Sequence, residues 1–103
     1  MAGVADGPGA YELSLTSGYC VYPRGRSAVV YIGTSTRLRK RLGSYLRGYA
    51  HSEALRRLIA TESLALRLAI SADHRALESH LIHGFLEGFG ALPLLNKVRP
   101  KLA

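Results

Sequence analysis

Arg37, Arg41 and Tyr45 recur at intervals of four residues, so they share one face of an expected helix. A guanidinium group binds a phosphate through two parallel hydrogen bonds, and a phenol adds a further hydrogen-bonding group. Arg41 is well placed on this stripe to stabilise the charge of a phosphoryl group under attack. A solvated basic helix face is the alternative interpretation of the same pattern.

Three further side chains have chemistry that depends on their surroundings. Tyr31 carries a phenol that orients or deprotonates an attacking water, or it packs as an ordinary strand aromatic. Glu78 is an isolated carboxylate, which suits a Mg²⁺ ion that keeps much of its hydration shell; the alternative is an exposed helix glutamate. Asn96 contacts a phosphate or forms a turn.

The composition favours an anionic partner. Fourteen Lys and Arg residues oppose seven Asp and Glu residues, which gives a formal net charge of +7. Arginine predominates, and arginine matches phosphate geometry better than lysine does. Other basic residues are therefore candidates for contacts with flanking phosphates, and a solvated face remains open for two of them, Arg39 and Lys40. The full set is Arg39, Lys40, Arg47, Arg56 and Arg57.

The 103 residues fit one domain, which we expect to span residues 11–103. Residues 1–10 contain three glycines and a proline and read as a flexible lead-in. No apolar run is long enough to cross a membrane, and residues 1–10 do not have the pattern of a signal peptide. The single cysteine excludes a disulfide within the chain, so we expect an intracellular protein, in the cytoplasm or with the nucleoid or nucleus.

The elements that position these side chains follow from periodicity and turn residues. Two strands joined by a Pro-Arg-Gly turn form an expected hairpin, two helices follow, and a third strand precedes a long helix. The long helix is expected to place Ala76, Leu77, His80, Leu81, Gly84 and Phe85 near its buried face. The order is β-β-α-α-β-α, over residues 18–23, 28–33, 34–47, 52–59, 63–70 and 73–89, and residues 92–96 are expected to be non-helical.

Several of these features stand in the order of a known motif. The second strand ends in Tyr31-Ile32-Gly33, Gly18 lies thirteen residues before Tyr31, and Arg41 lies ten residues after it. Glu78 lies in the long helix, and residues 92–96 read Leu-Pro-Leu-Leu-Asn. Over residues 18–96 the sequence therefore resembles the GIY-YIG nuclease family.

The resemblance implies an α/β fold of the α+β type, a small three-stranded antiparallel sheet flanked by helices. It implies a metal-dependent DNA endonuclease that hydrolyses phosphodiester bonds, with Mg²⁺ or Mn²⁺ held by Glu78. Tyr31 is the implied general base, with catalytic roles for Arg41, Tyr45 and Asn96, while Gly18 and Gly33 shape the motif backbone. We expect nicking or structure-directed cleavage of DNA with weak intrinsic sequence specificity. A second copy of the chain or a separate targeting protein is the further partner to consider.

Two positions depart from the family pattern. Its first half reads Gly-Ile-Tyr, whereas this chain has Gly18-Tyr19-Cys20, so Cys20 occupies the position of the tyrosine. Tyr22 shares the strand face of Cys20, Tyr19 lies on the opposite face, and Thr34 replaces a frequent lysine. These four residues are assigned auxiliary roles. The alternative function is a catalytically weakened nucleic-acid-binding module, because Cys20 replaces the first tyrosine.

Overall fold

The computed structural model describes residues 6–48 and 52–96. These residues form five strands and three helices. In chain order they are β1 (Gly9–Leu15), β2 (Cys20–Tyr22), β3 (Gly25–Ser27), β4 (Val29–Ser35), α1 (Leu38–Leu46), α2 (Glu53–Thr61), β5 (Leu64–Ile70) and α3 (His74–Phe89).

β1 is the central strand of an antiparallel sheet with the order β4-β1-β5. It pairs with β4 from Gly9 opposite Ser35 to Leu13 opposite Tyr31, and a bulge follows before Ser14 meets Val29. All seven residues of β1 pair with β5 on the other side. The prediction of a small α+β domain with a three-stranded antiparallel sheet is confirmed.

The membership of that sheet differs from the sequence prediction. Residues 18–23 were expected to pair with residues 28–33, but β2 pairs with β3 in a separate two-stranded ribbon. β4 pairs with β1 instead. The reason is burial, because Tyr11 and Leu13 of β1 enter the core, whereas the three residues of β2 offer only Tyr22 as a buried side chain. The predicted hairpin is therefore wrong.

The domain also begins earlier than residue 11. Gly9 and Ala10 belong to β1 and are buried. Gly9 packs so tightly that a Cβ atom would lie 2.2 Å from the carbonyl oxygen of Ala69. The Gly7 carbonyl accepts a 2.9 Å hydrogen bond from the amide of Leu38 at the start of α1. Residues 6–10 are thus part of the domain, while residues 1–5 of the expected lead-in lie outside the described residues.

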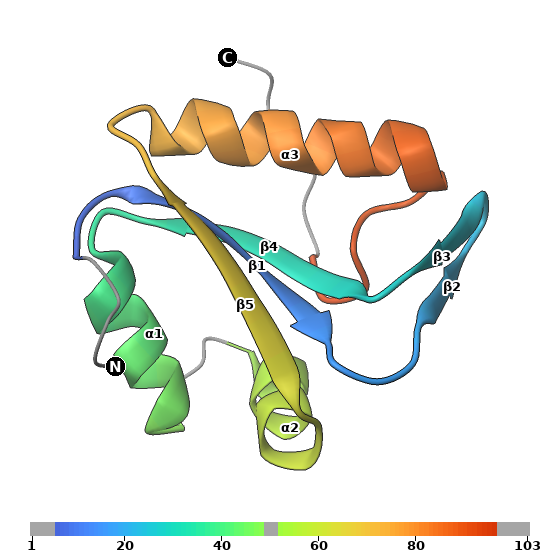
Figure 1. Ribbon diagram of the computed structural model, residues 1–103, viewed down its shortest axis with the longest axis horizontal. Coiled ribbons are helices and arrows are strands. Elements are labelled where there is room, and N and C mark those ends of the chain that lie inside the picture. Colours follow the sequence, from blue (N-terminus) through green and yellow to red (C-terminus); the bar gives the residue numbers. More distant parts are fainter. Residues whose placement is uncertain (1–5, 49–51, 97–103) are drawn as a thin grey trace.

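The sheet lies between two helical layers, with α3 on one face and α1 and α2 on the other (Figure 1). The core beside α1 and α2 includes buried residues of both helices and of β1, among them Tyr11, Leu13, Leu38, Leu42 and Leu55. The core beside α3 is built from Tyr22, Ile32, Ile82 and Phe85. The short ribbon of β2 and β3 packs its inner side into this second core.

The helices begin and end close to the predicted positions. Ser52 caps α2 by accepting a 3.1 Å hydrogen bond from the amide of Leu55. Gly48 after α1 and Gly90 after α3 have φ of 85° and 79°, a left-handed conformation that favours glycine. None of the helices in the described part of the chain is long and apolar enough to cross a bilayer.

The face that α3 buries was predicted only in part. Phe85 is buried as expected, but Ser79 and Ile82 are the other buried residues of the helix. Ala76, His80 and Gly84 are exposed. Apolar residues occur around much of the circumference of α3, so periodicity alone did not determine which side meets the sheet.

Candidate active site

Three tyrosine hydroxyls meet where β1, β4 and α1 come together. Tyr11 of β1 is 1% exposed, and its hydroxyl shares a 2.5 Å hydrogen bond with the hydroxyl of Tyr45 of α1. Tyr11 also forms a hydrogen bond with Tyr31 of β4, and the two ring centroids are 6.0 Å apart. The three phenols therefore form a hydrogen-bonded chain that runs from the core to the edge strand β4.

Gly33 makes room for this arrangement. A Cβ atom at Gly33 would lie 2.6 Å from the Tyr11 hydroxyl oxygen and 2.8 Å from Cε2 of Tyr31. Gly33 is directly opposite Tyr11 in the register of β1 and β4, so the Tyr11 ring lies across its backbone. The glycine is thus required by the close approach of two tyrosine rings, whereas the sequence explained it only as the end of a strand.

Arg41 extends the chain of hydroxyls at its Tyr45 end. Burial by itself would lower the pKa of Arg41, but a hydrogen bond with Tyr45 and the nearby hydroxyls of Tyr11 and Tyr31 raise it above its usual value. The guanidinium therefore keeps its charge. Its side chain remains exposed, so it can meet a phosphate while it contacts Tyr45.

Tyr31 has a perturbed hydroxyl. Burial raises the pKa of Tyr31 to about 12, and the neighbouring Tyr45 and the negative charge of Glu78 act in the same direction. The hydrogen bond with Tyr11 and the positive charge of Arg41 oppose this rise without cancelling it. The phenol is therefore neutral near pH 7, and a neutral phenol can both donate and accept hydrogen bonds.

Glu78 brings a carboxylate to the same place from α3. Burial raises the pKa of Glu78 above its usual value, and the positive charges of His74 and Arg75 offset only part of the rise. Glu78 acts electrostatically on Tyr31, although α3 and α1 lie on opposite faces of the sheet. Because β4 is an edge strand, groups from both faces can meet around it.

A metal ion at this position would have one carboxylate from the protein. Among residues 6–48 and 52–96, no three His, Cys, Asp or Glu side chains come close enough to share a metal ion. Glu78 alone is too few ligands for zinc, which needs three or four. One carboxylate fits Mg²⁺, whose remaining ligands are usually waters and substrate phosphate oxygens. The residues present therefore fit Mg²⁺ or Mn²⁺ held through Glu78.

Asn96 forms hydrogen bonds with the backbone of β4. Its Oδ1 accepts a 3.0 Å hydrogen bond from the amide of Ile32, and its Nδ2 donates a 2.8 Å hydrogen bond to the carbonyl of the same residue. The amide of Leu95 donates to the carbonyl of Val30 at 2.9 Å. Residues 95–96 thus close the outer edge of β4 on either side of Tyr31, and the contacts of Asn96 indicate a structural role.

Cys20 lies outside the three-stranded sheet that contains Tyr31. Gly18 lies in an exposed loop with φ of 88°, and Tyr19 is 69% exposed. The strand that faces Tyr31-Ile32-Gly33 is β1, which begins Gly9-Ala10-Tyr11. The Gly-x-Tyr segment in the strand that pairs with β4 is thus residues 9–11, whereas residues 18–20 do not pair with β4.

Tyr22 and Thr34 have structural partners. The Tyr22 hydroxyl donates a 2.8 Å hydrogen bond to the carbonyl of Val29 and accepts one of 3.0 Å from the amide of Leu94. Thr34 Oγ1 donates to the carbonyl of Gly9 at 2.9 Å and lies 2.7 Å from Nδ1 of His74. Tyr22 anchors the β2–β3 ribbon, and Thr34 joins the end of β4 to β1 and to the start of α3.

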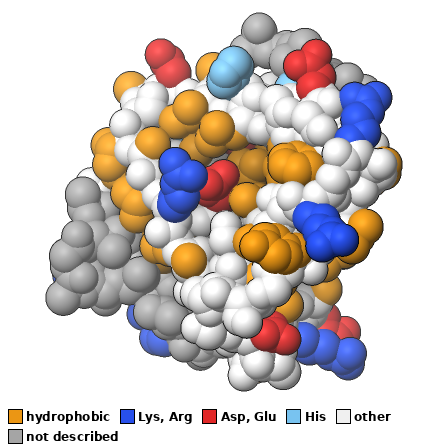
Figure 2. Space-filling model, turned by 45° about the vertical axis from the view of Figure 1, so that its right-hand side comes forward, with side chains coloured by type: hydrophobic (Ala, Val, Ile, Leu, Met, Phe, Trp, Pro, Cys, Tyr) orange, Lys and Arg blue, Asp and Glu red, His pale blue; other side chains and the backbone are white. Residues whose placement is uncertain are grey.

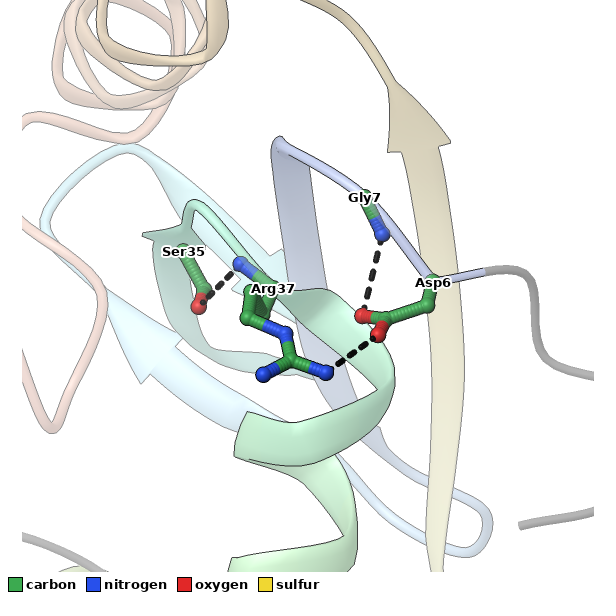
Figure 3. A network of polar contacts seen from close by, with 4 residues as sticks. All are labelled: Asp6, Gly7, Ser35 and Arg37. Atoms are coloured by element: carbon green, nitrogen blue, oxygen red, sulfur yellow. Dashed lines mark hydrogen bonds and ion pairs between the residues drawn. The ribbon is translucent and has the colours of Figure 1, made fainter.

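Arg37 is held by the segment that precedes β1 (Figure 3). Its Nη2 lies 3.1 Å from Oδ2 of Asp6, and the hydrogen bond from Arg37 lowers the pKa of that carboxyl. Asp6 Oδ1 also accepts a 3.0 Å hydrogen bond from the amide of Gly7, while Ser35 Oγ accepts one of 3.0 Å from the amide of Arg37. The Arg37 guanidinium therefore already has an anionic partner.

The other basic residues that the sequence predicted as phosphate ligands lie on two helices or at their ends. A shallow surface hollow beside the start of α1 is lined by Asp6, Arg37, Arg39, Lys40, Gly43 and Arg47. Arg56 and Arg57 belong to α2, and Arg57 forms a 2.9 Å ion pair with Glu53. The α1 group is the one that lies on the same helix as Arg41.

A second hollow, with a volume of about 260 Å³, lies between α3 and the strands β1 and β5. Its lining is mainly apolar and includes Leu68, Leu77 and Leu81, with the Glu12–Arg67 ion pair at 3.4 Å. Figure 2 shows a face of the molecule on which hydrophobic side chains gather around charged ones. Tyr11 also lines this hollow, but Tyr31, Tyr45 and Arg41 do not, and we assign the hollow no catalytic role.

Tyr11 is the residue that sequence reasoning missed. Its signal was present, because Gly9 and Tyr11 have the Gly-x-Tyr spacing and Tyr11, Leu13 and Leu15 alternate as in a strand. The usual distance between the two halves of the motif favoured Gly18. In this chain the β2–β3 ribbon is inserted in the sequence between β1 and β4, so the two paired strands are further apart along the chain than the usual spacing.

Comparison with known proteins gives no match: no protein-family model fits the sequence, and no curated protein or solved structure is significantly similar to it. The interpretation of this site therefore depends on its residues and their geometry.

Proposed function

We propose that this protein is a metal-dependent DNA endonuclease that hydrolyses phosphodiester bonds in the manner of the GIY-YIG family. The observation that carries the proposal is the group of side chains around the Tyr31 hydroxyl. Tyr11, Tyr45, Arg41 and Glu78 come from three elements other than β4, and each of them affects the pKa of Tyr31. Phenols, a guanidinium and a carboxylate together are suited to the attack of water on a phosphate.

Each residue has a separate task in this proposal. The Arg41 guanidinium binds the scissile phosphate and stabilises the negative charge that develops on it. The neutral Tyr31 hydroxyl orients the attacking water by accepting its hydrogen bond. Tyr45 holds both Arg41 and Tyr11, so the hydroxyl chain fixes the guanidinium relative to Tyr31. Glu78 holds Mg²⁺ or Mn²⁺, which when bound polarises the phosphate oxygens and stabilises the leaving oxygen.

The pairing of β1 with β4 gives the proposal further support. Gly9-Ala10-Tyr11 differs from Gly-Ile-Tyr at one position, and it lies beside Tyr31-Ile32-Gly33. The alternative of a weakened binding module depended on Cys20 standing where the first tyrosine belongs. With Tyr11 in that place, the chain offers no missing tyrosine to explain a loss of cleavage.

The test is cleavage of supercoiled plasmid and of branched DNA with Mg²⁺ or Mn²⁺. We expect the parent protein to nick DNA, and we expect Glu78→Gln, Arg41→Gln and Tyr31→Phe to lose cleavage. Glu87→Gln is the matched control, because Glu87 is an exposed carboxylate on the same helix. A parent protein that binds DNA without cutting it would contradict the proposal. Equal loss of activity in the Glu87 variant would contradict the role of Glu78.

A further inference from the structure

The β2–β3 ribbon exposes apolar side chains on its outer side. Side chains alternate along β2, so Cys20 and Tyr22 face the core while Tyr19 and Val21 face outwards. Val21 is 83% exposed and Tyr19 is 69% exposed, more than any other large hydrophobic side chain in the described part of the chain. Val21 lies opposite Arg26 of β3, which is also exposed. The outer side of the ribbon therefore presents three kinds of side chain: the aromatic Tyr19, the aliphatic Val21 and the cationic Arg26.

The ribbon is fixed to the rest of the domain. The Tyr22 ring packs edge-on against Phe85 at a centroid distance of 5.0 Å, and its hydroxyl bonds to Val29 and Leu94. At the turn, the Arg24 amide donates a 3.0 Å hydrogen bond to the carbonyl of Phe89, and Nη1 donates one of 2.7 Å to the carbonyl of Glu87. These contacts hold the ribbon against the end of α3, so its outer side keeps a fixed orientation (Figure 1).

The charge of the protein is concentrated in the part of the sequence that contains the ribbon. Between Glu12 and Glu53 there is no acidic residue, and there are seven basic ones. Basic and acidic residues balance in the remainder of the chain, so this stretch accounts for the whole net charge of +7. The seven basic residues are Arg24, Arg26, Arg37, Arg39, Lys40, Arg41 and Arg47.

This stretch runs through the ribbon, β4 and α1, and therefore also contains Tyr31 and Arg41. None of the ion pairs among the described residues involves Arg26. The Tyr22 hydroxyl contacts Val29, and Tyr31 follows Val29 by two residues, or about 7 Å along a strand. The base of the ribbon thus joins the strand that carries Tyr31. Arg24 and Arg26 lie on the ribbon itself, and the other five basic residues of the stretch lie on α1 or at its ends. A surface with this excess of positive charge favours a polyanion.

We infer that the outer side of the β2–β3 ribbon binds DNA at an exposed base, as at a gap or a branch. Tyr19 stacks on the exposed base, Val21 packs against the neighbouring base, and Arg26 pairs with an adjacent phosphate. Apolar side chains gain little binding energy from the charged backbone of an intact duplex. An unstacked base offers them a flat apolar surface, and an aromatic ring can stack on any of the four bases. The inference rests on the proposed function, because it takes DNA as the substrate.

The test compares binding to an intact duplex and to a gapped duplex of the same sequence and length, measured by fluorescence anisotropy in a metal chelator. We expect the parent protein to bind the gapped duplex more tightly. The double variant Tyr19→Ser/Val21→Ser should lose about tenfold in affinity for the gapped duplex and little for the intact one. Arg26→Gln should weaken both equally and lower the slope of log affinity against log salt by about one.

The control is Ile70→Ser, which removes an apolar side chain that is 48% exposed on β5, outside the β2–β3 ribbon. It should leave the preference for the gapped duplex unchanged. Thermal unfolding of all variants checks that they are folded. Absence of a preference in the parent protein, an unchanged preference in the double variant, or an equal loss in the control would each overturn the inference.

Plasmid cleavage by the same variants separates this inference from the proposed function. If the parent protein cleaves plasmid DNA and the double variant keeps the preference for the gapped duplex, the role of the ribbon is overturned and the proposed nuclease activity is not. A preference that depends on Tyr19 and Val21 in a protein that never cleaves DNA would support the ribbon and contradict the nuclease.

Discussion

Replacing Tyr11 by phenylalanine tests the central role that the structure gives to this residue. The change removes the hydroxyl that bonds to Tyr45 and Tyr31 and keeps a ring that is 1% exposed, so the packing of the core is preserved. A net hydrogen bond contributes about 1 kcal/mol to stability, so the loss of two costs about 2 kcal/mol. For a domain of this size, that corresponds to a fall of about 8–16 °C in Tm.

The effect on cleavage should be larger than the effect on stability. Without the Tyr11 hydroxyl, the hydrogen-bonded path from Tyr31 through Tyr11 to Tyr45 and Arg41 is broken. Proton-transfer and orienting groups of this kind contribute about 10²–10⁴-fold to a rate. We therefore expect the initial rate of plasmid nicking to fall by about 100-fold or more in Tyr11→Phe, measured at a temperature where the variant is folded.

Two matched variants make the result interpretable. Tyr22→Phe also removes a hydroxyl that makes two hydrogen bonds, so it should lower stability while leaving cleavage intact. Cys20→Ala should cleave at the parent rate. If Tyr11→Phe cleaved like the parent protein and Cys20→Ala lost activity, residues 18–20 would be the functional segment, and our reasoning from the pairing of β1 with β4 would be refuted.

Three further predictions concern the surroundings of the site. Gly33→Ala places a Cβ atom 2.6 Å from the Tyr11 hydroxyl, and overpacking of this kind costs about 1–3 kcal/mol, so the midpoint of urea unfolding should fall; an unchanged midpoint would mean that the rings move freely. Asn96→Ala removes both hydrogen bonds to the backbone of Ile32 and should destabilise the domain by about 2 kcal/mol. The salt dependence of DNA binding should not change. A changed slope of log affinity against log salt would instead assign Asn96 to phosphate binding. Burial raises the pKa of Tyr31 to about 12, so the folded state holds this proton more tightly than the unfolded chain, whose tyrosines titrate near pH ~10. The stability that Tyr31 contributes is therefore full below that pH and is lost as the pH rises towards the folded value. Urea unfolding followed into this alkaline range should show the loss, and Tyr31→Phe should show less of it.

The structure also assigns tasks to residues whose chemistry the sequence left open. Arg37 was a candidate phosphate ligand, but it pairs with Asp6 and fixes residues 6–7 against the start of α1. Asn96 was a candidate catalytic residue, but both ends of its amide bind the backbone of Ile32. In both cases the residue type suited several partners, and only the fold determined which partner was close.

Local patterns in the sequence were sufficient for much of the fold. The helices containing Arg41 and Glu78, the strand that contains Gly33 and the capping residues Ser52 and Gly90 all depend on neighbours within a few positions. The stripe of Arg41 and Tyr45 on α1 likewise follows from helical geometry. These features could be predicted because the interactions that fix them are short in sequence.

The partner of β4 was decided by the tertiary structure alone. Residues 9–11 and residues 18–20 both begin with a glycine, and distance along the sequence favoured residues 18–20, which do not pair with β4. Burial of Tyr11 and Leu13 between the sheet and α1 selects β1, and that contact joins residues far apart in the chain. The sequence by itself determined which groups are available for chemistry. The pairing of distant strands, driven by the burial of apolar surface, decided that Tyr11 is the residue beside Tyr31.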